Sequence, residues 1–250
     1  MSPLYSSFNY SFGEGDGTPR IVTDGLVLNL DAGRQNSYGG SGTTWRDLSG
    51  IGNAGILTNG PTYSSSNGGF LSFDGTNDFV DIPSGIPQRT DNFSNEIWIY
   101  PTNLAGGNAG YSTLLKQSEG TRDFYFTLRS NGAVHCEIRN IANTAYDNFD
   151  TTSGVILINN WYQIVQVFSL TSQNISFYVN GVLRLSSTTP AYPSFYLTNS
   201  MQIAQQGTDT SNTFARRLTG RVSNVKLYNR ALSAAEIQQN FNAMRGRYGV

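Results

Sequence analysis

The sequence predicts an all-β protein, an antiparallel sandwich or barrel that ends in one short C-terminal helix. Three observations lead to this fold class. Short runs rich in β-branched and aromatic residues recur from residue 25 to residue 228 with no helical pattern between them. Two Asn-Gly pairs, at 131–132 and 180–181, each separate two such runs, and helical spacing begins only after residue 231. Strands without alternating helices argue against a parallel βαβ fold.

The predicted strands follow one another at short intervals. The first is the run Gly25–Asp31, which stops at a turn formed by Asp31, Ala32 and Gly33. Two long surface loops are expected, at 101–111 and 140–160. The clearest later strands are Gly69–Phe73, Phe79–Ile82, Glu96–Tyr100, Thr113–Lys116, Asp123–Arg129, Ala133–Arg139, Trp161–Phe168, Ile175–Val179, Val182–Ser186, Met201–Ala204 and Arg221–Tyr228.

Two hairpins are well specified. The pairs Asn131-Gly132 and Asn180-Gly181 each lie between strand-like runs. Asn-Gly supplies the two positive-φ positions of a type I′ turn, whose twist matches that of the flanking strands. We therefore expect type I′ hairpins at both places.

The C-terminal segment carries the sequence pattern of a helix start. Ser233 and Glu236 have the spacing of a capping box, and Ile237, Phe241 and Met244 follow at helical intervals. The pattern predicts one helix that ends near residue 245.

The chain divides into an arm and one domain. Residues 21–250 are long enough for a single large β-sandwich with a sizeable core. Residues 1–20 end in a glycine-rich run and predict an extended arm with a linker, or else a disordered terminus. Four aromatic side chains could dock the arm on a neighbouring protein: Tyr5, Phe8, Tyr10 and Phe12.

Charge and cysteine content exclude several classes of protein. The formal net charge of −1 offers no basic footprint for nucleic acid, and the Arg216, Arg217 and Arg221 group is interpreted as a solvated loop. Cys136 is the only cysteine, so no intramolecular disulfide forms. No secretory signal or membrane-spanning run is present, which predicts synthesis in the cytoplasm.

Several segments, in order and spacing, resemble one known family. They are GLVLNLDAG (25–33), TTWRDLSGIGNAG (43–55), NGPTYSSSNGGFLSFDGTNDFVDI (59–82), FSNEIWIYP (93–101), NNWYQIVQVF (159–168), ISFYVNGVL (175–183) and GRVSNVKLYNRALSAAEIQQNF (220–241). They are similar to the laminin G-like, concanavalin A-like jelly-roll family, in the form common in bacteriophage and bacterial surface proteins. The resemblance covers about residues 21–245 and implies two antiparallel sheets of about six or seven strands each.

The resemblance implies two functions of different class. The first is a non-enzymatic bacteriophage virion protein, a capsid decoration or tail-fibre and receptor-binding component, located in the virion. Its arm would bind other virion proteins, its fold would bind host surface polysaccharide, and symmetric assembly would make it a homo-oligomer. The alternative is a free carbohydrate-binding lectin module that is assisted by Ca²⁺.

Catalysis is not expected, although some relatives are glycoside hydrolases. Such enzymes place paired carboxylates on one strand, and Glu96 has no acidic residue two or four positions further on. A pair assembled from different strands remains the third hypothesis. The only histidine, His135, lies next to Cys136, and adjacent residues of a strand point to opposite faces. We therefore interpret His135 as structural.

One loop has the composition of a calcium site. Asp74, Asn77 and Asp78 surround a glycine with oxygen-bearing side chains, which hard cations require. The same residues also suit a β-turn in which carboxylates accept from backbone amides. Both interpretations stay open from the sequence.

Aromatic residues in loops are the candidates for stacking on sugars. Trp98 and Trp161 lie in strand-like runs and are expected in the core, whereas Trp45 is expected to be exposed. The glycan-binding candidates are Trp45, Tyr38, Tyr63, Tyr111 and Tyr146.

Overall fold

The computed structural model describes residues 20–84, 86, 92–106, 110–119, 122–139, 146–189, 200–205 and 216–250. The proposed anchoring residues of the arm lie outside these ranges: Tyr5, Phe8, Tyr10 and Phe12. The division into an arm and a domain therefore stays a prediction.

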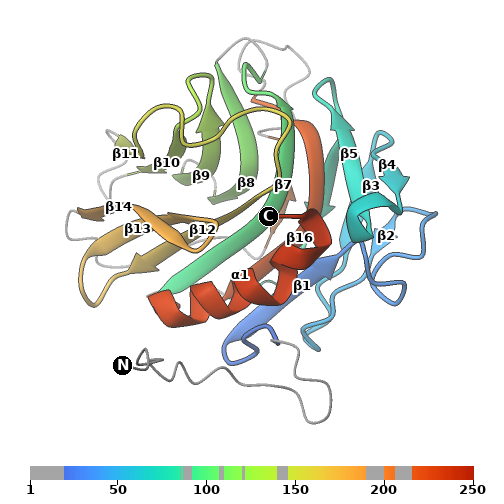
Figure 1. Ribbon diagram of the computed structural model, residues 1–250, viewed down its shortest axis with the longest axis horizontal. Helices are drawn as coiled ribbons and strands as arrows, with labels where there is room; N and C mark the ends of the chain where they lie inside the picture. The colour runs from blue at the N-terminus through green and yellow to red at the C-terminus, as the bar shows by residue number, and fades with distance from the viewer. Residues whose placement is uncertain are drawn as a thin grey trace, which may run out of the picture.

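Two antiparallel sheets pack face to face (Figure 1). One of them, the helix-covered sheet, has the order β14-β13-β12-β7-β16-β5-β4, with β1 also paired to β16. Its strands are β1 (Leu26–Asp31), β4 (Thr62–Ser64), β5 (Phe70–Asp74), β7 (Phe93–Asn103), β12 (Tyr162–Ser169), β13 (Asn174–Val179), β14 (Val182–Thr188) and β16 (Thr219–Tyr228). A 3₁₀ turn, η1 (Ser66–Gly68), joins β4 to β5.

The second sheet, the opposite sheet, has the order β11-β10-β9-β8-β15-β6-β3-β2. Its strands are β2 (Thr44–Trp45), β3 (Gly55–Thr58), β6 (Phe79–Ile82), β8 (Tyr111–Glu119), β9 (Arg122–Arg129), β10 (Val134–Arg139), β11 (Tyr146–Asp150) and β15 (Met201–Ile203). The predicted all-β sandwich is confirmed, and the described residues form eight strands in each sheet.

The core lies between the sheets and follows the period-two alternation of the strands. On β9, Phe124, Phe126 and Leu128 are buried in the main apolar cluster, together with Phe93 of β7 and Phe177 of β13. The ring of Phe93 stacks on Phe168 and meets Phe124 edge-on. Every second residue of β8, β9 and β10 consequently points to the outer face of the opposite sheet.

The two hairpins differ in their turns. At β13–β14, Asn180 and Gly181 have φ of 52° and 76°, so the expected type I′ turn is confirmed. At β9–β10 the expectation is wrong, because only Gly132 has positive φ, at 78°. There Gly132 N and Ala133 O bond to the backbone of Arg129, which makes a three-residue loop with its glycine in the bulge position.

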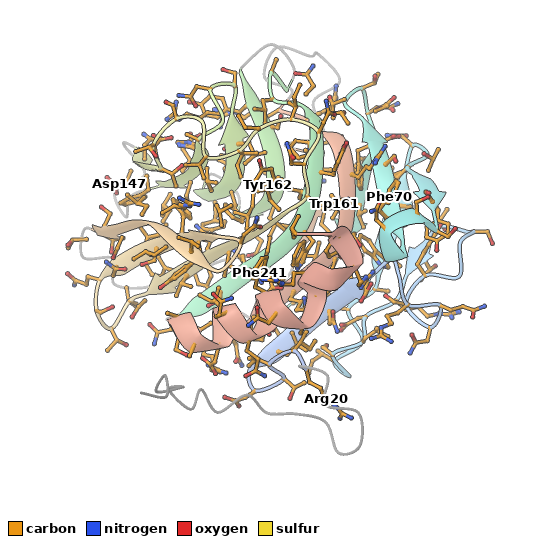
Figure 2. All side chains as sticks on the ribbon, in the orientation of Figure 1. Arg20, Phe70, Asp147, Trp161, Tyr162 and Phe241 are labelled. Carbon is orange, nitrogen blue, oxygen red and sulfur yellow. The ribbon has the colours of Figure 1, made fainter. Side chains whose placement is uncertain are left out.

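The helix α1 (Ala234–Tyr248) begins with the predicted capping box and runs three residues beyond 245. It crosses the outer face of the helix-covered sheet (Figure 1). Trp98 of β7 stacks on Phe241 and Tyr248 at ring separations of 5.9 and 4.2 Å. Figure 2 shows Phe241, Trp161 and Phe70 along this aromatic layer, which continues from α1 to β5. In the described ranges, no helix is long and apolar enough to cross a membrane.

A buried ion pair lies under α1. Lys226 of β16 and Glu96 of β7 are both fully buried, and Lys226 Nζ donates to Glu96 Oε1 over 2.9 Å. Asn240 of α1 donates to the second carboxylate oxygen over 2.7 Å, and Lys226 also donates to Asn224. The pair thus connects the helix to two central strands.

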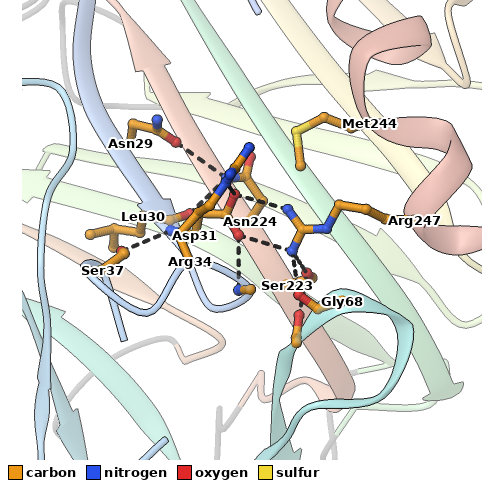
Figure 3. Close-up of polar contacts among 12 residues, drawn as sticks. Asn29, Leu30, Asp31, Arg34, Ser37, Gly68, Ser223, Asn224, Met244 and Arg247 are labelled. Atoms are coloured by element: carbon orange, nitrogen blue, oxygen red, sulfur yellow. Dashed lines mark hydrogen bonds and ion pairs between the residues drawn. The ribbon is translucent and has the colours of Figure 1, made fainter. Parts of the chain in front are cut away.

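A second polar group, the Arg247 clamp, holds the last turn of α1. Arg247 makes two parallel bonds to Asp31 of β1, at 2.8 and 2.9 Å, and a third to the Gly68 carbonyl at 2.7 Å (Figure 3). Tyr248 donates to Ser223 over 2.8 Å. A side chain at Gly33 would overlap the Arg247 guanidinium, so this turn needs glycine.

Candidate functional site

The outer face of the opposite sheet carries a concentrated group of polar and aromatic side chains, which we call the outer cluster. The cluster is formed by alternate residues of β8 to β11 together with a residue from the segment that leads to β16. Its members are Tyr111, Thr113, Tyr125, Thr127, Arg129, His135, Glu137, Asp150 and Arg216.

Arg129 anchors one side of the outer cluster. It pairs with Asp150 through two nitrogens, Nε to Oδ1 and Nη2 to Oδ2, and its Nη1 donates to the Tyr111 hydroxyl over 2.7 Å. Burial alone would lower the Arg129 pKa, but the Asp150 carboxylate outweighs it and the pKa is raised. His135 Nδ1 lies 2.9 Å from Asp150 Oδ1. Because an ionised carboxylate only accepts, the Nδ1 of a neutral His135 must be the donor.

Arg216 forms the other side. Its Nη1 donates to Glu137 Oε2, and its guanidinium lies 4.3 Å from the Tyr111 ring centroid and 5.4 Å from that of Tyr125. Burial favours the neutral carboxyl of Glu137, but its contacts with His135 and Arg216 outweigh this, so its pKa is lowered. The Nε2 of His135 is 3.7 Å from Glu137 Oε2, which is too long for a hydrogen bond.

Several buried polar atoms of the outer cluster have no hydrogen-bond partner in the described part of the chain. They are the hydroxyls of Thr113 and Thr127, His135 Nε2 and Arg216 Nε. Leaving a buried polar group unpaired costs about 1–3 kcal/mol. These four atoms lie on one sheet face, where polar groups of another molecule could satisfy them.

Only one of the predicted sugar-stacking residues, Tyr111, has a side chain placed in the outer cluster. Tyr63 is half-buried, and its ring lies 5.4 Å from that of Tyr38. Tyr146 belongs to β11, but its side chain is outside the described residues.

Two of the candidates are buried, which corrects the expectation that they are exposed. Trp45 is 0% exposed and packs in the core between the sheets, where Gly55 is paired opposite it. Tyr38 is 4% exposed, and its hydroxyl donates to the Gly42 carbonyl. Neither ring can stack on a sugar in this conformation.

The proposed calcium loop is organised as a turn. Asp74 Oδ1 accepts from the amides of Thr76 and Asn77 at 2.7 and 3.3 Å, and Asp78 Oδ2 accepts from the Asp74 amide at 3.1 Å. Partial burial opposes ionisation of Asp74, but these amide bonds lower its pKa. Among the described residues, no three His, Cys, Asp or Glu side chains gather to hold a metal. The turn interpretation accounts for the side chains of Asp74 and Asp78, whereas Asn77 takes part through its backbone amide and carbonyl.

From the sequence, His135 was expected to be structural and Arg216 to lie in a solvated loop, whereas Arg129, Glu137 and Asp150 were not candidates for binding. His135 and Glu137 are two apart on β10, and this spacing could have indicated a shared outer face. No sequence pattern near Arg216 predicts its place in the outer cluster, because its partner Glu137 lies 79 positions away in the sequence.

The sequence of residues 74–238 matches the family model for the Concanavalin A-like lectin/glucanases superfamily, which is more than half of the 250 residues. No curated protein sequence matches the chain.

Solved structures with the same fold include receptor-binding domains of botulinum neurotoxins. The C/D mosaic serotype domain has a TM-score of 0.68 at 14% identity, over 88% of this chain and 51% of the other. The serotype D ligand-binding domain, solved in complex with N-acetylneuraminic acid, has a TM-score of 0.68 at 12% identity, over 88% and 51%. Type C, which depends on interaction with two ganglioside molecules to enter cells, gives 0.68 at 15%, over 89% and 52%. The chain thus spans about half the length of these structures.

Proposed function

The chain belongs to the concanavalin A-like lectin/glucanase superfamily, and we propose that it binds glycans at the outer cluster without cleaving them. The observation that carries this proposal is that two layers of polar and aromatic side chains lie one over the other on the same sheet face. An outer layer of Tyr111 with Arg129 and Arg216 lies over buried threonine and histidine atoms that lack partners.

Sugars need this mixture of groups. Each hydroxyl both donates and accepts, so a binding face must offer fixed donors and acceptors beside an apolar or aromatic surface. The arginine–carboxylate pairs of the outer cluster hold such groups in fixed geometry. The fold is also shared with a toxin domain that was solved with N-acetylneuraminic acid, which supports a glycan as the ligand class.

Two carboxylates, Glu137 and Glu96, support binding without cleavage. A glycoside hydrolase needs one carboxylic acid whose pKa is raised so that it can protonate the leaving group. The pKa of Glu137 is lowered instead, which keeps it ionised. Glu96 is fully buried under α1 and paired with Lys226, out of reach of a polysaccharide. These two arguments support a non-enzymatic role.

The test is a glycan array followed by titration calorimetry with the strongest ligand. We expect dissociation constants from micromolar to millimolar, about −8 to −4 kcal/mol. Tyr111→Ala should weaken binding at least about tenfold, because it removes the ring that Arg129 and Arg216 contact. The matched control is Arg221→Ala, since Arg221 contacts Phe70 and Tyr100 on the other sheet. An array without any bound glycan, or equal affinity for Tyr111→Ala, would contradict the proposal.

We further propose that this binding serves a bacteriophage particle, with the chain as a decoration or tail component. The form of the sequence motifs and the aromatic arm support this setting. Light scattering should show that the full chain is a homo-oligomer and that removal of residues 1–20 dissociates it. Absence of the protein from purified particles of a virus that encodes it would refute the virion role and leave a free lectin module.

A further inference from the structure

Building on the proposed glycan-binding function, we infer that the outer cluster selects acidic glycans, and that Arg216 pairs with the sugar carboxylate. The inference rests on three features of the cluster: its charge balance, the fixed position of Arg216 and the donors that lie beneath it.

The charge balance favours an anion. Within the outer cluster Arg129 and Arg216 balance Glu137 and Asp150, and Lys116, whose ammonium lies 5.9 Å from the Tyr125 ring centroid, adds one positive charge beside the cluster. The whole chain, by contrast, has a formal charge of −1. Both carboxylates already accept bonds from arginines, so they offer little to a ligand that must donate.

Arg216 is the arginine with donor capacity left. Arg129 uses all three of its nitrogens, two on Asp150 and one on Tyr111. Arg216, in contrast, has a buried Nε without an acceptor in the described residues. Among the described residues, its Nη1 donates to Glu137. A ligand carboxylate could accept from this Nε. It would then pair with the guanidinium in the side-on geometry that arginine prefers.

The position of Arg216 is fixed before any ligand arrives. Its guanidinium lies over the rings of Tyr111 and Tyr125, and its side chain is only 16% exposed. A cation held in this way loses little conformational entropy on binding, and partial burial reduces screening by salt. Both effects strengthen a charged contact more than a contact with a neutral hydroxyl.

The buried atoms on the same face supply further donors. The hydroxyls of Thr113 and Thr127 lack partners, and each can donate a proton to an acceptor. A carboxylate has about four acceptor positions, whereas a sugar hydroxyl has two. A carboxylate therefore satisfies a donor-rich face more completely than a neutral sugar does.

The experiment compares glycan pairs that differ only in charge. We would titrate the full chain with uronic-acid oligosaccharides and their carboxyl-reduced forms, and with sialyllactose and lactose. We expect the acidic member of at least one pair to bind about tenfold or more tightly, with a preference that falls as salt is raised. Arg216→Gln should weaken binding to the acidic forms by a larger factor than binding to the reduced forms, so that the two forms bind about equally.

Arg216→Lys tests whether the ligand needs the paired donors of a guanidinium or only a positive charge. Lysine keeps the positive charge near Glu137 but lacks the side-on pair of donors, so we expect it to recover only part of the preference. Denaturant unfolding of both variants would confirm that each is folded. Equal binding of acidic and reduced forms would overturn the inference and leave the glycan-binding function intact, whereas no binding to any glycan would refute both.

Discussion

Replacing Lys226 by methionine should strongly destabilise the protein. The Lys226 ammonium is fully buried and donates to Glu96, Asn224 and the Met244 sulfur. Methionine has a similar length and no charge, so the packing under α1 is largely kept. What changes is the buried Glu96 carboxylate, which would lose the bond from Lys226 and keep the one from Asn240.

The magnitude follows from the contacts that are lost. Breaking a buried pair by removing one partner costs about 3–5 kcal/mol, because the remaining charge keeps its desolvation penalty. For a chain of 250 residues each kcal/mol lowers Tm by about 2–4 °C, so the expected loss is about 6–20 °C. Since domains have about 5–15 kcal/mol of stability, the variant should fold but be marginal.

Urea unfolding, followed by intrinsic fluorescence, measures the effect. The exposed Arg184→Met on β14 serves as a control and should change stability by less than about 0.5 kcal/mol. The double variant with Glu96→Gln should cost less than the sum of the two single variants, by about 1–3 kcal/mol. A Lys226→Met cost below about 1 kcal/mol, or strict additivity, would refute the reasoning that an uncompensated carboxylate drives the loss.

Three other predictions concern local structure. The pKa of Glu236 is lowered from 4.5 to about 2, mainly by the bond from Arg230. The contribution of the ionised Glu236 to the stability of the fold is therefore fully present above pH 4.5 and is lost as the pH falls towards 2. Glu236→Gln should cost about 1 kcal/mol at pH 7 and progressively less below pH 4.5 in denaturant unfolding, whereas a pH-independent cost would contradict this. Gly132→Ala should lower the thermal unfolding temperature more than Gly154→Ala. Both glycines have positive φ, but only at Gly132 would a Cβ lie 2.3 Å from a backbone oxygen. Equal losses of stability in the two variants would exclude that contact as the cause. Asp47→Asn should cost about 1–3 kcal/mol, because Asp47 accepts from four backbone amides, and hydrogen exchange at those amides should speed up.

Strands rich in β-branched and aromatic residues could be predicted because these residues distinguish them from the turns on either side. β6 was predicted with its bounds, and β13 and β16 to within two residues. β11 was missed because YDNFD contains Asp and Asn, which are depleted in strands, and lies where a loop was expected. The burial of Trp45 was missed for a different reason, since a strand of two residues shows no alternation.

The outer cluster could be predicted only in part. Tyr111 was a candidate from its residue type alone, whereas its contacts with Arg129 and Arg216 depend on three separate segments. The sequence shows that His135 and Glu137 occupy one face of β10, but it does not show what is opposite them. Sites assembled across strands depend on sheet order, and the order β11-β10-β9-β8-β15 is set by long-range pairing.

The position of β16 in the helix-covered sheet has a consequence for synthesis on the ribosome. This strand pairs with β1, β5 and β7, although it is formed by residues 219–228 and is the last strand along the chain. Until it leaves the exit tunnel, the earlier strands have unpaired edges that can join with other chains. The nascent polypeptide therefore completes this sheet only after residue 228 has left the tunnel, and the Arg247 clamp, which pairs with Asp31, forms later still.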